Sequence, residues 1–204
     1  MSTSPRRRSS TSSSTTTRRS SRSSRARKKR KRKTTTRPEP ALLGLGSNLG
    51  SPRRQLLAAL AELSRRLGPL TVAPLYRSAP VSPIPQPPYL NSVALLRSEL
   101  SPEALLDLTQ QLERAAGRVA GPRWGPRQLD IDLLIYGDRC RRAAELTLPH
   151  PRLRERAFVL APLADLAPDL QLPPDGRRVR ELLAALPAQA RAIERVSWTG
   201  PDSP

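Results

Sequence analysis

The 204-residue sequence predicts an α+β domain with the element order β-α-β-β-α-β, followed by additional C-terminal helices and preceded by a disordered basic tail. Two observations predict this class. Short apolar runs bounded by turn residues, typical of strands, alternate with longer segments in which leucine recurs every three or four residues, as on one face of a helix. A Ser-Pro pair opens both longer segments, as is typical of a helix N-terminus. The order is that of the ferredoxin-like split unit, an antiparallel sheet with both helices on one face.

The first three elements are a strand, a helix and a strand. Residues 41–45 form a short apolar run that ends in the turn Gly46-Ser47-Asn48-Leu49-Gly50. Ser51-Pro52 begins a helix whose leucines follow at spacings of four, three and four, and Gly68 ends it. Residues 70–76 are the second strand.

The next three elements follow a proline-rich loop over residues 77–88, because proline cannot donate to a sheet ladder. Residues 89–96 are the third strand. Ser101-Pro102-Glu103 begins the second helix, which runs toward Gly117, and residues 129–136 are the fourth strand.

Two helical stretches, at 156–166 and 179–186, are expected to cover the other face of the sheet. The remaining long loops lie at 77–88 and 117–126, and both flank strands that carry polar residues. Long loops in compact domains are often functional, so we expect the chemistry there.

Positive charge is concentrated at the N-terminus. The formal net charge is +19, and residues 1–40 hold 15 of the 36 Lys and Arg but only one of the 17 acidic residues. Residues 1–36 consist almost entirely of Ser, Thr, Arg and Lys, which cannot bury enough apolar surface to offset the entropy of ordering. We therefore expect a disordered tail over 1–40, a folded domain over 41–198 and a frayed end at 199–204.

The single cysteine, Cys140, excludes an internal disulfide and fits a reducing compartment, so a cytoplasmic location is expected. No apolar run is long enough to cross a bilayer, and no signal-peptide core follows Met1. We expect a soluble monomer that does not contact membranes.

Asp130-Ile131-Asp132 interrupts an otherwise apolar strand. Because strand side chains alternate between faces, both carboxylates should project to one side. Two like charges this close raise each other's pKa unless a cation lies between them. Arginine can supply that charge, and so can magnesium, which commonly takes one or two carboxylates and fills its remaining positions with phosphate and water. The alternative is an exposed pair that is salt-bridged to nearby arginines.

Arginines lie close to this pair in sequence. Arg118 and Arg123 belong to the preceding loop, and Arg127 precedes Asp130 by three residues. The planar guanidinium matches phosphate oxygens, and carboxylates for metal beside arginines for phosphate are the groups that phosphoryl transfer requires. Trp124, between two of these arginines, is interpreted as part of a ligand-facing lid, with a plain core position as the alternative.

Two other polar features carry weaker signals. His150, the only histidine, lies between two prolines that stiffen its backbone, so its ring is either structural or held toward a phosphate. The glycines at 44, 46 and 50 do not match the dinucleotide fingerprint, and no Walker-type Gly-Lys-Ser/Thr occurs. The turn at 46–50 is therefore interpreted as structural support at the end of the first strand.

Several segments, in unbroken order over roughly residues 41–186, match one family pattern. The most specific is Arg123-Trp124-Gly125-Pro126-Arg127-Gln128-Leu129-Asp130-Ile131-Asp132. The others are Gly46-Ser47-Asn48-Leu49-Gly50, Tyr76-Arg77-Ser78, Gln86-Pro87-Pro88-Tyr89-Leu90-Asn91, Glu113 to Gly117-Arg118, and Leu148-Pro149-His150-Pro151 with Arg156 and Phe158. Together they resemble the 6-hydroxymethyl-7,8-dihydropterin pyrophosphokinase family of folate biosynthesis.

The resemblance implies an ATP-dependent diphosphotransferase that acts on a pterin alcohol and releases AMP. It implies two Mg²⁺ ions held by Asp130 and Asp132, ATP as co-substrate, and a catalytic role for these two residues with Arg118 and Arg127. The implied pterin site, in which aromatic rings sandwich a flat heterocycle and an amide bonds its edge, consists of Ser78, Val81, Tyr89, Asn91 and Phe158. The implied nucleotide-binding residues are Gln110, Glu113, Trp124, His150 and Arg156.

Four positions depart from the family pattern. Where the family often has an arginine, this chain has Ala120, and where the family sometimes has a basic residue, this chain has Glu145. Arg123 or Arg154 is expected to compensate for the missing positive charge. The threonine and proline expected at the pterin wall are Ser78 and Ala79, which makes that loop less rigid without threatening the chemistry.

The alternative function is a basic nucleic-acid-binding protein that acts through its tail. Seven consecutive positive charges, Arg27 to Lys33, should bind polyanions weakly and in a salt-dependent way. The six aromatic residues of the chain are too few for a base-stacking surface, so such binding is expected as a secondary property. Two more interpretations of the tail are an organelle transit peptide, whose apolar face it lacks, and a solvated extension without function.

Overall fold

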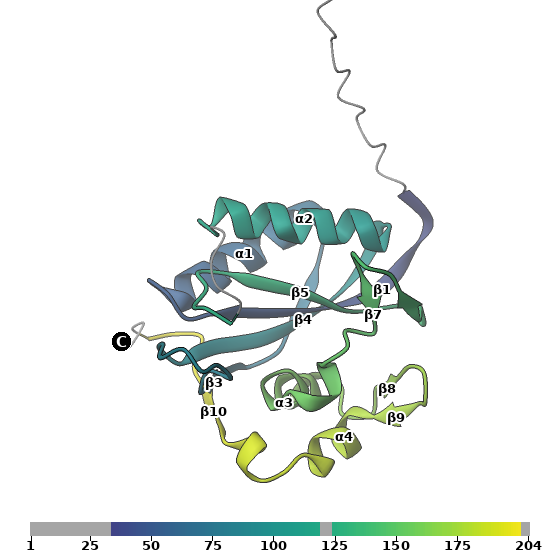
Figure 1. Cartoon of the computed structure of the whole chain (residues 1–204). Coiled ribbons are helices and arrows are strands. Elements are labelled where there is room, and N and C mark those ends of the chain that lie inside the picture. Colours follow the sequence, from purple (N-terminus) through teal and green to yellow (C-terminus); the bar gives the residue numbers. More distant parts are fainter. Residues whose placement is uncertain (1–33, 119–123, 201–204) are drawn as a thin grey trace, which may run out of the picture. The chain divides into compact units, whose positions relative to one another are not determined.

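The protein's structure is a computed structural model that describes residues 34–118 and 124–200 (Figure 1). The basic run at 27–33 and the positions of Ala120 and Arg123 lie outside these described residues. The strands are β1 (Thr34–Ser47), β2 (Leu70–Val72), β3 (Leu75–Ser78), β4 (Tyr89–Leu100), β5 (Asp130–Tyr136), β6 (Arg141–Arg142), β7 (Thr147–Leu148), β8 (Gln171–Leu172), β9 (Arg177–Arg178) and β10 (Ile193–Val196). The helices are α1 (Pro52–Leu67), α2 (Pro102–Ala115), α3 (Ala157–Leu166) and α4 (Val179–Ala185), with 3₁₀ turns at Leu153–Glu155 and Gln189–Arg191.

The main sheet has six strands in the order β10-β3-β4-β1-β5, and β2 also pairs with β4. All its pairings are antiparallel. The first strand of the β-α-β-β-α-β order thus lies between the third and the fourth, as it does in a ferredoxin-like split unit. The predicted fold class is confirmed.

Helices cover both faces of this sheet (Figure 1). On one face, Leu43 and Leu45 of β1 belong to the same buried cluster as the apolar residues of α1 and α2. Leu42, which precedes them in β1, faces the other way into a second cluster with apolar residues of α3 and α4. Because strand side chains alternate between faces, β1 contributes side chains to both hydrophobic cores.

A bulge in β5 adjusts this alternation. Leu42 pairs with Ile135 and Leu43 with Leu133, so Leu134 is the extra residue. Both Leu134 and Ile135 consequently lie in the α3 and α4 core, whereas Leu133 and Tyr136 lie in the α1 and α2 core.

Two strands differ from their predicted ranges. β1 begins at Thr34, seven residues before the predicted strand, since β4 also continues to Leu100 and offers its backbone as a partner. The predicted strand at 70–76 is divided into β2 and β3 next to Pro74, which has no N–H to donate.

The sequence did not predict β10. Its four residues pair with β3, and Ile193 lies opposite Ser78. The following residues are held too, because the buried Arg53 donates from Nε to the carbonyl of Ser197 at 3.1 Å and from Nη1 to that of Gly200 at 3.2 Å.

None of the helices within residues 34–118 and 124–200 combines the length and the apolar character that a bilayer crossing requires.

Candidate active site

The two carboxylates of β5 lie beside a part of the sheet where the neighbouring strand has glycines and therefore no side chains. Asp130 pairs with Gly46 and Asp132 with Gly44, while Ile131 points into the opposite core. A Cβ at Gly46 would lie 3.1 Å from Asn91 Oδ1, and one at Gly44 would lie 3.2 Å from a Leu134 methyl group. Because both neighbours are glycines, the space in front of the carboxylates remains open as part of a pocket of about 450 Å³. The prediction that both aspartates share one face is confirmed.

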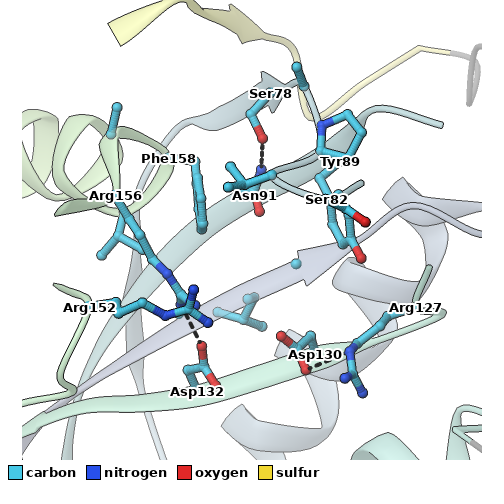
Figure 2. A pocket seen from close by; sticks show the side chains of 18 of the residues that line it. Ser78, Ser82, Tyr89, Asn91, Arg127, Asp130, Asp132, Arg152, Arg156 and Phe158 are labelled. Carbon is cyan, nitrogen blue, oxygen red and sulfur yellow. Dashed lines mark hydrogen bonds and ion pairs between the residues drawn. The ribbon is translucent and has the colours of Figure 1, made fainter. Parts of the chain in front are cut away.

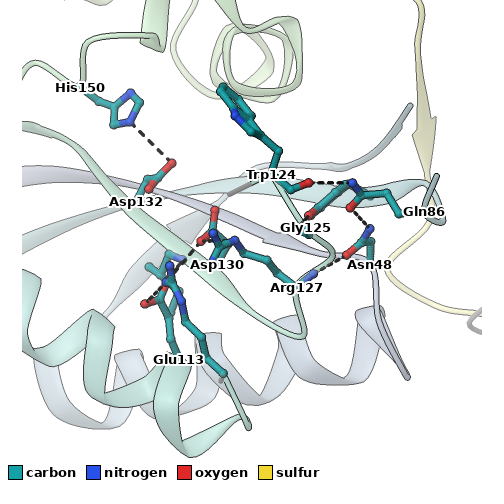
Figure 3. Close-up of polar contacts among 12 residues, drawn as sticks. Asn48, Gln86, Glu113, Trp124, Gly125, Arg127, Asp130, Asp132 and His150 are labelled. Carbon is teal, nitrogen blue, oxygen red and sulfur yellow. Dashed lines mark hydrogen bonds and ion pairs between the residues drawn. The ribbon is translucent and has the colours of Figure 1, made fainter. Parts of the chain in front are cut away.

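Cationic side chains approach the pair from both sides (Figures 2 and 3). Arg118 and Arg127 lie 3.5 and 3.7 Å from Asp130 Oδ1. Arg156 donates to Asp132 Oδ2 at 3.1 Å, and His150 Nε2 lies 3.8 Å from the same oxygen. Of these four contacts only that of Arg156 with Asp132 is a hydrogen bond, so the carboxylate oxygens are not saturated by them.

Burial shifts the titration of these groups. It raises the pKa of Asp130, and the neighbouring charge of Asp132 raises it further, although Arg127 and Arg118 act in the opposite direction. Burial likewise lowers the pKa of His150, against the attraction of Asp132. A carboxylate whose charge is disfavoured in this way gains from any additional cation.

The donor set fits magnesium. Asp130 and Asp132 keep side-chain exposures of 35% and 36%, and the described residues contain no cluster of three or more His, Cys, Asp or Glu that could enclose a metal. Magnesium typically uses one or two carboxylates together with phosphate oxygens and water, so an open pair suits it better than a closed cage would.

Next to the carboxylates the pocket forms an aromatic slot. Asn91 is buried at its base and donates to Ser78 Oγ at 2.9 Å. Phe158 and Tyr89 flank Asn91 on opposite sides (Figure 2). Val81, 72% exposed, also lines this part of the pocket. Two rings on either side of an amide suit a flat, polar-edged heterocycle.

Asn48 joins the loops around the site (Figure 3). Its Oδ1 accepts from the backbone N–H of Arg127 at 2.7 Å, and its Nδ2 donates to Gln86 Oε1 and to the carbonyl of Pro87, both at 3.0 Å. Gln86 in turn donates to the carbonyl of Trp124 at 2.8 Å. The interpretation of the 46–50 turn as structural support is confirmed.

Most of the site residues expected from the sequence line one pocket. These are Ser78, Val81, Tyr89, Asn91, Trp124, Arg127, Asp130, Asp132, Arg156 and Phe158. Arg118 and His150 contact the aspartates from outside that lining. Sequence reasoning assigned no role in the site to Gln86 or Arg152, which also line the pocket.

Two residues expected to contact the nucleotide, Gln110 and Glu113, do not belong to the lining of this pocket, and their nucleotide contacts stay a prediction. Gln110 is exposed on α2 and does not line the pocket. Glu113 is only 3% exposed, accepts from the backbone N–H of Ile131 at 2.9 Å and pairs with Arg118. Its pKa is raised by burial. Glu113 thus supports β5 and Arg118 from behind the site, a role for which the sequence gives no signal.

The fold is of the α+β class, and its antiparallel sheet carries an open carboxylate pair, cationic side chains and an aromatic slot. This combination defines the class of metal-dependent phosphotransferases. Residues 42–168 match the family model described as 7,8-dihydro-6-hydroxymethylpterin-pyrophosphokinase. The chain belongs to this family of enzymes.

Curated relatives and solved structures agree with this assignment. The chain is 49% identical over 158 residues to the 2-amino-4-hydroxy-6-hydroxymethyldihydropteridine pyrophosphokinase of Pseudomonas aeruginosa, covering 76% of this chain and 94% of the relative. It is 44% identical over 135 residues to the enzyme of the same name from Haemophilus influenzae, covering 65% and 84%. The Plasmodium falciparum HPPK-DHPS structure with pteroate matches with a TM-score of 0.59 at 14% identity, covering 72% of this chain and 42% of that chain, and supports the fold alone.

Proposed function

We propose that this protein transfers the diphosphate group of Mg·ATP to the hydroxymethyl oxygen of 6-hydroxymethyl-7,8-dihydropterin and releases AMP, a step of folate biosynthesis. The observation that carries the proposal is the joining of two subsites in one pocket. The carboxylate pair lies opposite Gly44 and Gly46, and Asn91, the partner of Gly46 on its other side, forms the base of the aromatic slot.

The pterin subsite is the slot. Stacking between Tyr89 and Phe158 would bury both faces of the ring, and Asn91 would bond the pyrimidine edge. The Asn91 amide is already oriented by its bond to Ser78, so less side-chain entropy is lost when the ligand binds. This geometry would bring the hydroxymethyl group of the ring toward Asp130 and Asp132.

The nucleotide subsite is the cationic side of the pocket. Arg118, Arg127 and Arg156 would hold the phosphate oxygens, since a planar guanidinium can bond two of them at once. Asp130 and Asp132 would hold two Mg²⁺ ions. When bound there, magnesium neutralises phosphate charge and lowers the pKa of an adjacent hydroxyl.

Catalysis would then rest mainly on positioning. The pterin oxygen forms a bond to the β-phosphorus as the bond from that phosphorus to the bridging oxygen breaks, and AMP leaves with the bridging oxygen. The hydroxyl proton passes to solvent. The two aspartates fix the line of attack, the arginines stabilise the charge that shifts onto AMP, and the aromatic walls exclude competing water.

The test is a coupled assay for AMP with the purified protein, Mg·ATP and the reduced pterin alcohol. AMP should appear only when the pterin is present. Formation of ADP in place of AMP would refute the reaction type.

Three finer points belong to the same proposal. A monomeric protein should elute at its chain mass in size-exclusion chromatography. A cytoplasmic location, supported by the single exposed Cys140, is tested by fractionation of cells that express the full chain. Weak polyanion binding by the tail should disappear when residues 1–36 are deleted, while pterin turnover persists.

A further inference from the structure

Of the two arginines expected to compensate for Ala120 and Glu145, the structure describes only Arg154, and Arg154 does not line the pocket. Arg123 lies outside the described residues. Arg154 is bound to Asp175 at 2.5 and 2.7 Å and donates to the carbonyl of Pro173 at 2.9 Å. It is therefore committed to the loop between β8 and β9, and Glu145 itself is exposed and does not line the pocket.

A different arginine lies where the positive charge is needed. Arg152 lines the main pocket, just before the 3₁₀ turn that leads to Arg156. Figure 2 shows the side chains of Arg152 and Arg156 extending into the same region above Asp132, while Arg127 lies beside Asp130. Arg152 and Arg156 line this side of the pocket together with Asp132 and Glu155, so two guanidinium groups face the place where phosphate oxygens would lie.

Trp124 holds Arg152 in position. The guanidinium carbon lies 4.2 Å from the centroid of the indole ring, which is cation–π geometry. The N–H groups of a guanidinium lie in its own plane and point outward from its edge, so stacking of its face on a ring is compatible with bonds to phosphate.

The indole is itself held in place. Trp124 has φ of 69°, a left-handed conformation that costs free energy for any residue with a side chain. Its carbonyl accepts from Gln86, and the carbonyl of Gly125 accepts from Tyr89 Oη at 3.3 Å. These bonds fix an unfavourable backbone conformation that places the ring beneath Arg152.

We propose that Arg152 binds the phosphate chain of the nucleotide and that Trp124 is the platform that orients it. Arg152 then supplies phosphate-binding charge that Glu145 does not. The inference rests on the proposed function, because it takes the pocket to be the site for Mg·ATP. It changes the role expected for Trp124 from a direct nucleotide contact to a support for the residue that makes the contact.

Binding can be measured without turnover by calorimetric titration of Mg·ATP into pterin-free protein. Arg152→Gln should weaken Mg·ATP about ten- to hundredfold, the range for loss of charge-assisted hydrogen bonds. Arg152→Lys should weaken it less, because the charge is retained but the planar fork is lost. The affinities for adenosine and for the pterin alcohol should not change. Arg54→Gln is the matched control, since it removes the same charge from an exposed position on α1.

The platform is tested by a double-mutant cycle. Trp124→Phe should retain most of the affinity for Mg·ATP, whereas Trp124→Leu should bind Mg·ATP more weakly. The double variant Arg152→Gln/Trp124→Leu should bind Mg·ATP no more weakly than Arg152→Gln alone. If the losses of Mg·ATP affinity in the two single variants add up in the double variant, the proposal that Trp124 orients Arg152 is refuted. Wild-type affinity in Arg152→Gln, or an equal loss for adenosine, would overturn phosphate binding by Arg152. If the wild-type protein neither binds Mg·ATP nor releases AMP, the proposed function falls and this inference with it. Circular dichroism and thermal unfolding show which variants are folded.

Discussion

Replacement of Asn48 by alanine should destabilise the fold and the site together. The side chain is 2% exposed and makes three hydrogen bonds, to the backbone N–H of Arg127, to Gln86 and to the carbonyl of Pro87. Each is worth about 0.5–1.5 kcal/mol net, and partners left buried without replacement add to the loss, so Asn48→Ala should cost about 2–4 kcal/mol. For a domain of this size that corresponds to a fall in Tm of about 5–12 °C.

The same change should also lower activity. The three bonds hold the loop at 86–88 and the loop that carries Trp124 and Arg127 to the end of β1, so their loss frees one wall of each subsite. We expect kcat/KM for AMP release to fall at least tenfold, with KM raised for both substrates. Urea unfolding and steady-state kinetics measure the two effects on one sample.

A cycle with Gln86→Ala isolates the Asn48–Gln86 bond. Because the two side chains share one hydrogen bond, the double variant should be less destabilised than the sum of the single variants by about 1 kcal/mol. Arg54→Ala, at an exposed position on α1, is a control for surface substitution. An Asn48→Ala protein with the unfolding midpoint and kcat/KM of the wild type would refute the proposed role of Asn48.

Three further predictions follow from the site and the fold. Asp130→Ala and Asp132→Ala should each lower AMP release by several orders of magnitude while thermal unfolding still reports a folded protein; a loss below tenfold would exclude the carboxylates from the reaction. Gly46→Ala should raise KM for the pterin, because its Cβ would lie 3.1 Å from Asn91 Oδ1, whereas Gly44→Ala meets only a flexible leucine; equal KM values would contradict this. Burial, then the bond to Asp165, raises the pKa of Tyr76 to about 12, so folding favours the neutral phenol. Its stabilising contribution is complete below pH 10 and is lost as the pH rises toward 12, and Tyr76→Phe should flatten this part of the Tm–pH curve.

Local patterns in the sequence were sufficient to predict the main elements. The Ser-Pro pairs and leucine spacings correctly predicted α1 and α2, whose helices begin at Pro52 and Pro102. The same-face placement of Asp130 and Asp132 followed from strand geometry alone. These features depend on neighbours in sequence, so no knowledge of tertiary pairing was needed.

Features that depend on distant partners could not be predicted in this way. The open space in front of the carboxylates exists because the register of β1 on β5 places Gly44 and Gly46 opposite them. β10 has no strong apolar pattern of its own and forms because β3 offers an unpaired edge. The bond from Glu113 to the backbone of Ile131 likewise joins two elements whose contact no sequence pattern indicates.

The position of β10 affects the self-association of the protein, because β10 covers an edge of the main sheet. An exposed strand edge is a template onto which a second molecule can add a strand, and proteins usually block such edges. Here the blocked edge is β3, whose last residue, Ser78, orients the amide of Asn91. A shortened chain that ends before Ile193 would therefore expose the edge of β3 next to the substrate slot. We expect such a chain both to form multimers and to lose affinity for the pterin.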